Sequence, residues 1–146
     1  MKAPFTLEQF LTVFQTYNLA VWPLEIAAYL LGAGAVLLVF IRIKGGDRII
    51  SAILSLMWLA NGLLYHITFF SAINKAAYVF GAMFIIQALM FFWQGVLKNG
   101  LVFGKTGAWY QTTGLIFIAY AMVIYPLLGI PAGHVWPRAP MLSLIH

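Results

Sequence analysis

The stretch IISAILSLMWLANGLLYHITFFS, residues 49–71, decides the fold class of this chain. It contains no Asp, Glu, Lys or Arg, and it is longer than the roughly 20 helical residues that cross the hydrocarbon core of a bilayer. The whole chain has the same character, because 64% of its 146 residues are apolar and only 8% are charged, against about 25% charged residues in a soluble domain. We therefore predict an all-α integral membrane protein.

Three further apolar runs are long enough to span a membrane. We predict membrane-spanning helices over residues 19–41, 49–71, 76–97 and 109–130, followed by an outer tail over residues 131–146. The connections between the spans are too short to contain a soluble domain. The sequence therefore predicts one transmembrane domain over residues 1–146, folded as a bundle of four transmembrane helices.

Residues 5–18, FTLEQFLTVFQTYN, precede the first span and have a different pattern. Aromatic and aliphatic side chains recur at helical spacing, polar side chains occupy the other face, and Thr6 with Gln9 forms a capping-box pattern. The segment is too polar to span a membrane, so we predict an interfacial amphipathic helix at the outer surface; the alternative is a solvent-facing helix packed on loops. Pro23 suits the first turn of the span that follows, because its missing N–H would be unpaired there in any case.

The basic residues predict the orientation in the membrane. Five of the eight Lys and Arg residues, Arg42, Lys44, Arg48, Lys98 and Lys105, lie in the first and third connections, which share one side of a four-span bundle. Cytoplasmic loops carry an excess of Lys and Arg. We therefore expect these two connections in the cytoplasm and both termini on the outer, periplasmic side.

Glu25 is the only acidic residue within the predicted spans. Near the start of a helix, its carboxylate would meet free backbone N–H groups and the positive end of the helix dipole, which explains it without a functional role. Acidic residues inside spans are rare, however, so a functional carboxylate is the alternative. Tyr29 lies one turn deeper on the same face and would extend a hydrogen-bonded chain from Glu25.

His66 lies in the outer third of the second span, and Gly62, one turn before it, provides a notch where another backbone can approach. We expect the imidazole to point into the bundle, toward Glu25, Tyr29 or the segment around His134. A neutral structural histidine, a proton relay, a metal ligand and an axial cofactor ligand are all open interpretations. Because the tail returns His134 to the side of Glu25 and His66, these three residues are a candidate site for zinc, copper or non-haem iron, although no close ligand spacing marks it.

Other polar and small residues indicate helix packing. Asn61 and Gln87 both lie near the membrane midplane, where an unpaired amide is costly, so we predict a hydrogen bond between them across spans two and three. Tyr65 belongs to the same polar stripe as Asn61 and is a further structural polar contact. Small residues form predicted packing seams in three spans: Gly81, Ala88 and Gly95; Ser51 and Ser55; Ala28 and Gly32.

Three blocks of the sequence resemble a known family. They are PFTLEQFLTVFQTYNLAVWP at 4–23, NGLLYHITFFSAIN at 61–74 with FGAMFIIQA at 80–88, and YPLLGIPAGHVWPRAP at 125–140. The chain resembles an uncharacterised family of bacterial multi-span inner-membrane proteins, a domain of unknown function. The resemblance implies a bacterial inner membrane and no particular activity. Members of the family continue past the third block with a different segment, so we expect this chain to be shortened at its C-terminus.

Few classes of function remain for this chain. The sequence contains no nucleophile–base pair and no phosphate-binding loop, its lack of cysteine excludes thiolate and iron–sulfur sites, and its net charge of +5 suits anionic headgroups better than nucleic acid. We predict a non-enzymatic accessory or structural subunit of a larger bacterial membrane complex, without catalytic residues and with no cofactor identified. Its helices would meet lipid, other subunits or a second copy, with pigment or quinone as further candidates. The alternative is a small protein with an outer His/Glu site for metal, cofactor or proton handling, or a minor transporter.

Overall fold

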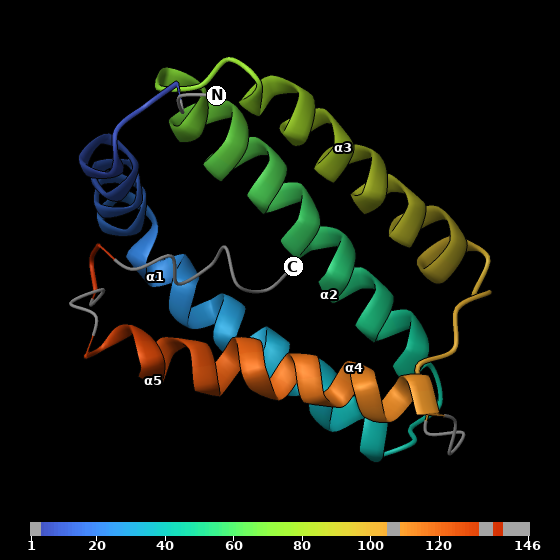
Figure 1. The fold of residues 1–146 in the computed structure, drawn as a ribbon. Helices are drawn as coiled ribbons and strands as arrows, with labels where there is room; N and C mark the ends of the chain where they lie inside the picture. The colour runs from blue at the N-terminus through green and yellow to red at the C-terminus, as the bar shows by residue number, and fades with distance from the viewer. Residues whose placement is uncertain (1–3, 105–108, 132–135, 139–146) are drawn as a thin grey trace.

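The computed structural model describes residues 4–104, 109–131 and 136–138 (Figure 1). Every regular element in these residues is helical, and four helical stretches are long and apolar enough to cross a membrane: Leu7–Phe40, Gly46–Ala72, Ala77–Leu97 and Trp109–Gly129. The prediction of an all-α membrane protein with four spans is confirmed. The elements in chain order are α1 (Leu7–Phe40), α2 (Gly46–Ala60), η1 (Asn61–Phe69), η2 (Phe70–Ala72), α3 (Ala77–Met90), η3 (Phe91–Leu97), α4 (Trp109–Ala119), η4 (Tyr120–Ile124) and α5 (Tyr125–Gly129).

Helix α1 joins two segments that the sequence analysis separated. The predicted capping box is present, since Thr6 N–H donates to Gln9 Oε1 at 2.8 Å and Gln9 N–H donates to Thr6 Oγ1 at 3.2 Å. The helix then continues without a break to Phe40, so the prediction that Pro23 begins a new helix is wrong. Proline inside a helix removes one backbone hydrogen bond and bends it. Figure 1 shows the first turns of α1 running in a different direction from the later ones.

The main core lies where the first turns of α1 pack against η1 and η2. Phe14 stacks on Tyr65 with ring centroids 5.3 Å apart, and Tyr17 meets Tyr65 edge-on at 5.5 Å. The buried residues of this cluster are Val13, Phe14, Tyr17, Val21, Tyr65, Phe70 and Ala77. The aromatic face of residues 5–18 is therefore covered by the end of the second span, whereas an interfacial helix would turn that face to the membrane.

Helices α2 and α3 lie side by side and approach closely through small residues (Figure 1). A Cβ atom added to Gly62 would lie 3.0 Å from the carbonyl oxygen of Gly81. Ser55 Oγ donates to the carbonyl oxygen of Ala88 at 2.8 Å, and Ala88 is only 2% exposed. The seam predicted between the second and third spans is confirmed here.

The first and third connections meet at the other end of this helix pair. Asp47 Oδ1 accepts a hydrogen bond from the Phe103 N–H at 2.9 Å. A Cβ atom added to Gly104 would lie 2.7 Å from the Arg42 guanidinium. The two basic connections therefore share one end of the molecule, as the topology requires, and their cytoplasmic location stays a prediction.

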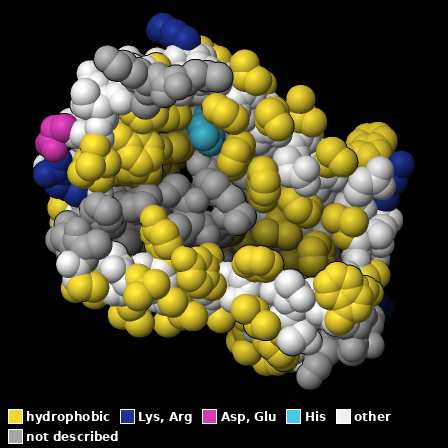
Figure 2. Space-filling model, in the orientation of Figure 1, with side chains coloured by type: hydrophobic (Ala, Val, Ile, Leu, Met, Phe, Trp, Pro, Cys, Tyr) yellow, Lys and Arg dark blue, Asp and Glu magenta, His cyan; other side chains and the backbone are white. Residues whose placement is uncertain are grey.

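The fourth span, formed by α4, η4 and α5, is packed differently from the other three. None of its residues from Trp109 to Gly129 is buried. It runs across α1 in Figure 1, and Met122 lies near Gly32, because a Cβ added to Gly32 would be 3.6 Å from Met122 Cε. Figure 2 shows hydrophobic side chains exposed along this helix. The fourth span is thus the least covered of the four membrane-length helices.

Candidate functional site

Polar side chains along α1 bind residues 136–138, which follow the fourth span. Asn18 Nδ2 donates to the carbonyl oxygen of Pro137 at 2.8 Å, although 119 positions separate the two residues. Asn18 is completely buried, with 0% of its surface exposed. A hydrogen bond of this kind fixes the tail backbone against the helix, because a buried amide that loses its partner raises the free energy of the folded state.

Two further contacts extend this attachment in both directions along α1. Trp136 Nε1 donates to Glu25 Oε2 at 3.3 Å, and Arg138 Nη2 pairs with Glu8 Oε1 at 2.5 Å. Three consecutive residues therefore meet Glu25, Asn18 and Glu8 in the order opposite to the chain direction of α1. We call these six residues the clasp: Glu8, Asn18, Glu25, Trp136, Pro137 and Arg138.

The members of the clasp differ in their exposure to solvent. Glu8 and Arg138 have side chains 74% and 39% exposed, so their ion pair contributes less than about 1 kcal/mol and is weakened by salt. Asn18 and Glu25 are buried, and their hydrogen bonds to the tail are partly buried. The two buried contacts consequently contribute most to the attachment of the tail.

Glu25 is placed differently from what the sequence suggested. It lies in the interior of α1, many residues after the helix start at Leu7, so free N–H groups at a helix start do not explain it. It is 6% exposed, its Oε2 accepts from Trp136, and its Oε1 is buried with no hydrogen-bond partner among the described residues. Tyr29 and Trp136 line a surface hollow with it, as predicted for Tyr29 on the same face. The hollow measures about 430 Å³.

His66 is buried against aromatic rings. It is 9% exposed, and its ring centroid lies 4.6 Å from that of Phe84 and 6.0 Å from that of Phe80, both on α3. Neither imidazole nitrogen has a hydrogen-bond partner in the part of the chain that the structure describes. The prediction that His66 points into the bundle is confirmed, but Glu25 and Tyr29 are not its partners. The Gly62 notch admits α3, so the same face of the helix turns His66 toward α3.

Only two of the three predicted metal ligands, Glu25 and His66, are among the residues that the structure describes. Residues 4–104, 109–131 and 136–138 contain no group of three or more His, Cys, Asp or Glu that could hold a metal ion. Glu25 is bonded to Trp136, whereas His66 is enclosed by rings of α3. His134 lies outside the described residues, so the site of Glu25, His66 and His134 stays a prediction.

The predicted polar pair of the second and third spans, Asn61 with Gln87, stays a prediction. Asn61 is 8% exposed and lines a cavity beside α1, while Gln87 is half-buried on α3. A hydrogen bond from Ser55 to the Ala88 carbonyl joins the two helices. Tyr65 contributes through ring packing in the aromatic core more than through its hydroxyl.

Sequence reasoning missed Asn18, Trp136 and Arg138 as partners. One signal was present, since the chain has only three acidic residues and two of them, Glu8 and Glu25, bind the tail. Charge pairing would have suggested Arg138 for one of these acids. The depth at which Asn18 lies depends on the bend of α1, which the sequence pattern does not reveal.

Comparison with known proteins places the chain in a family. Residues 7–145 match the family described as "Family of unknown function (DUF6064)". The chain belongs to DUF6064. No curated protein and no solved structure matches it. The resemblance to an uncharacterised family is thereby confirmed, and the match in this DUF6064 member includes both sides of the clasp, α1 and residues 136–138.

Proposed function

We propose that this DUF6064 member is a non-catalytic protein of the bacterial inner membrane that serves as an accessory or structural subunit of a larger membrane complex. One observation carries the proposal. The fourth span is a membrane-length apolar helix with no buried residue from Trp109 to Gly129. A helix that the described residues of its own chain do not cover is available to a helix of another subunit.

The contrast with the second and third spans supports this interpretation. Transmembrane helices associate through close packing at small residues, and α2 and α3 do so at Gly62 and Gly81. On α4, a Cβ added to Gly114 would have no atom within 4 Å. Gly114 therefore leaves a place on the fourth span where a partner helix can approach.

The clasp also suits a structural role. Asn18 and Glu25 use their polar atoms to bind the tail, which follows directly after the fourth span. This contact ties the C-terminal end of the fourth span to α1 without burying the helix itself. The fourth span is thus positioned relative to the bundle while its apolar surface stays open to a partner.

A second candidate is a proton-handling or cation-handling role at Glu25. The observation that favours it is the buried Oε1 atom, which has no hydrogen-bond partner among the described residues. Carboxylates within a membrane are costly and often functional. The predicted contribution of His134 would add a ligand to such a site.

Site-specific photocrosslinking in native membranes tests the subunit proposal. A benzophenone amino acid replaces Phe117 or Leu128 on the fourth span, and Val79 on α3 is the matched control; these residues are 66%, 58% and 63% exposed. We expect both fourth-span positions to give the same protein adduct, identified by mass spectrometry, and Val79 to give little or none. An adduct of twice the 16.3 kDa chain mass would identify a second copy as the partner. Adducts with lipid alone at Phe117 and Leu128 would contradict the proposal.

A further inference from the structure

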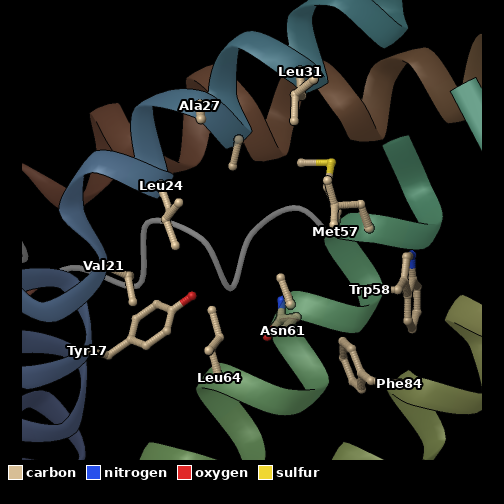
Figure 3. Close-up of a pocket in the computed structure, with 13 residues that line it drawn as sticks. Tyr17, Val21, Leu24, Ala27, Leu31, Met57, Trp58, Asn61, Leu64 and Phe84 are labelled. Atoms are coloured by element: carbon tan, nitrogen blue, oxygen red, sulfur yellow. The ribbon is translucent and has the colours of Figure 1, made fainter. Parts of the chain in front are cut away.

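A cavity lies between α1 and the second span, separate from the clasp (Figure 3). It measures about 210 Å³ and is lined almost entirely by apolar side chains. Its walls come from two separate parts of the chain, α1 on one side and α2 with η1 on the other, and Phe84 of α3 closes one end. Its lining includes Tyr17, Ala28, Trp58, Asn61 and Phe84.

Tyr17 places one polar atom in this apolar space. Its side chain is 3% exposed, and Figure 3 shows its hydroxyl pointing into the cavity. The ring is fixed by contacts with Tyr65 and Phe69, and the hydroxyl lies at the wall of the cavity. A ligand oxygen in the cavity can accept the hydroxyl proton, and a hydrogen bond in such an apolar space is electrostatically stronger than one in water.

The size of the cavity restricts what can occupy it. A cavity of about 150 Å³ lined by apolar side chains binds a benzene ring, and drug-sized pockets begin near 300 Å³. The 210 Å³ cavity therefore suits a single ring with short substituents. Trp58 and Phe84, whose ring centroids lie 4.7 Å apart, provide aromatic walls against which a flat ring can pack.

We propose that this cavity binds a lipophilic ring that carries a carbonyl oxygen, as a benzoquinone does, and that the oxygen accepts a hydrogen bond from Tyr17. The ring packs between α1 and Trp58, and its remaining substituents meet apolar side chains. Both walls belong to membrane-spanning helices, so the ligand enters from the bilayer. The inference does not depend on the subunit role proposed above.

Binding of two matched probes tests this site. Duroquinone and durene have the same tetramethyl ring, but only duroquinone has carbonyl oxygens. The protein is labelled with 5-fluorotryptophan, and the ¹⁹F signal of Trp58, assigned by the Trp58→Phe change, is followed as each probe is titrated. The other four of the five tryptophans do not line this cavity and report non-specific partitioning into detergent.

We expect saturable binding of duroquinone about fivefold tighter than that of durene, which is the effect of one neutral hydrogen bond. Tyr17→Phe keeps the ring packing and should remove the difference between the probes, whereas the exposed control Tyr78→Phe should retain it. Ala28→Leu should weaken both probes by filling the cavity, and Ala82→Leu on the exposed face of α3 should not.

Three results would overturn the inference. If durene bound as tightly as duroquinone, a hydrogen bond to the carbonyl oxygen would not contribute to binding. Discrimination that survives in Tyr17→Phe would place the donor elsewhere. Displacement of duroquinone by equimolar methyl palmitate would identify a lipid acyl chain, and not a ring, as the occupant. Each variant is first compared with the unchanged protein by thermal unfolding, so that loss of binding is not confused with loss of the fold.

Discussion

The indole N–H of Trp136 donates to Glu25 Oε2 at 3.3 Å across 111 positions of sequence. This contact joins Glu25, the one buried acid of the membrane-length helices in the described chain, to the segment that follows the fourth span. With the bond from Asn18 to Pro137, it fixes the tail along α1 in a single register. The tail is therefore attached to α1 at two positions seven residues apart, Asn18 and Glu25.

Replacing Asn18 by Ala should destabilise the protein by about 1–3 kcal/mol, because it removes the buried donor that binds the Pro137 carbonyl. The measurement is thermal or denaturant unfolding in detergent. The matched control is Thr16→Ala, an exposed residue of the same helix that bonds only to the Thr12 carbonyl. Equal stability of the Asn18 and Thr16 variants would show that the tail contact contributes little.

Two substitutions of Glu25 should distinguish whether its hydrogen bond or its negative charge holds the tail. Glu25→Gln keeps an oxygen that can accept from Trp136, so the tail should stay attached, whereas Glu25→Ala should release it. The readout is the fluorescence emission of Trp136 in a chain whose other tryptophans are replaced by Phe. Release by Glu25→Gln as complete as release by Glu25→Ala would mean that the negative charge, and not the acceptor oxygen, holds the tail.

The ion pair of Glu8 and Arg138 should contribute little by comparison. Both side chains are partly or largely exposed, so Glu8→Gln should lower the free energy of unfolding by less than about 1 kcal/mol, and added salt should shrink the effect. Unfolding curves at low and high salt measure this. A loss as large as that of Asn18→Ala would contradict the ranking of the clasp contacts.

Gly95→Ala should destabilise the second and third spans by about 1–3 kcal/mol, because the added Cβ would overlap the Ser51 side chain. Ser51→Gly removes the two nearest atoms that the methyl group would meet and leaves Leu101 Cδ1 at 3.3 Å, so the double variant should recover part of the loss. Gly34→Ala is the control, since nothing lies within 4 Å of its Cβ position. It should be neutral or slightly stabilising, because alanine favours the helix. Identical effects at Gly95 and Gly34 would rule out the close approach.

His66→Phe should leave the fold as stable as before, or more stable. The imidazole is enclosed by Phe80, Phe84 and other rings, and its nitrogens have no hydrogen-bond partner among the described residues. A phenyl ring fits this surrounding without burying polar atoms. Unfolding measurements check stability, and mass spectrometry with metal analysis of the protein purified gently from its native membrane checks function. Loss of a bound metal or partner in this variant would restore a functional role for His66.

The sequence predicted local features well and long-range contacts poorly. The capping box of Thr6 with Gln9 depends on neighbouring residues, and the small residues of the α2–α3 seam follow helical spacing, so both could be read from the pattern. The direction of the His66 side chain also followed from its helix. Its partners did not, because the same Gly62 notch can admit either of two helices, and the sequence does not say which.

The path of α1 accounts for the remaining errors. Pro23 often begins a helix, but here it lies within a continuous one, so the turns before it pack against η1 as core. That placement buries Asn18 and moves Glu25 away from any helix start. The tail contacts then join residues more than a hundred positions apart, and neither composition nor periodicity contains information about that register.

Crosslinking between Glu8→Cys and Arg138→Cys tests the attachment of the tail to α1 most directly, because the chain has no other cysteine and this exposed pair can be changed with little loss of stability. A short bismaleimide is added to membranes that contain the double variant, and the intramolecular bridge is identified by mass spectrometry of the digested protein. The control pairs Arg138→Cys with Lys98→Cys, which follows η3 at the opposite end of the bundle. We expect rapid intramolecular bridging between positions 8 and 138 and none between positions 98 and 138. Absence of a bridge between 8 and 138, or equal bridging in the two pairs, would contradict it.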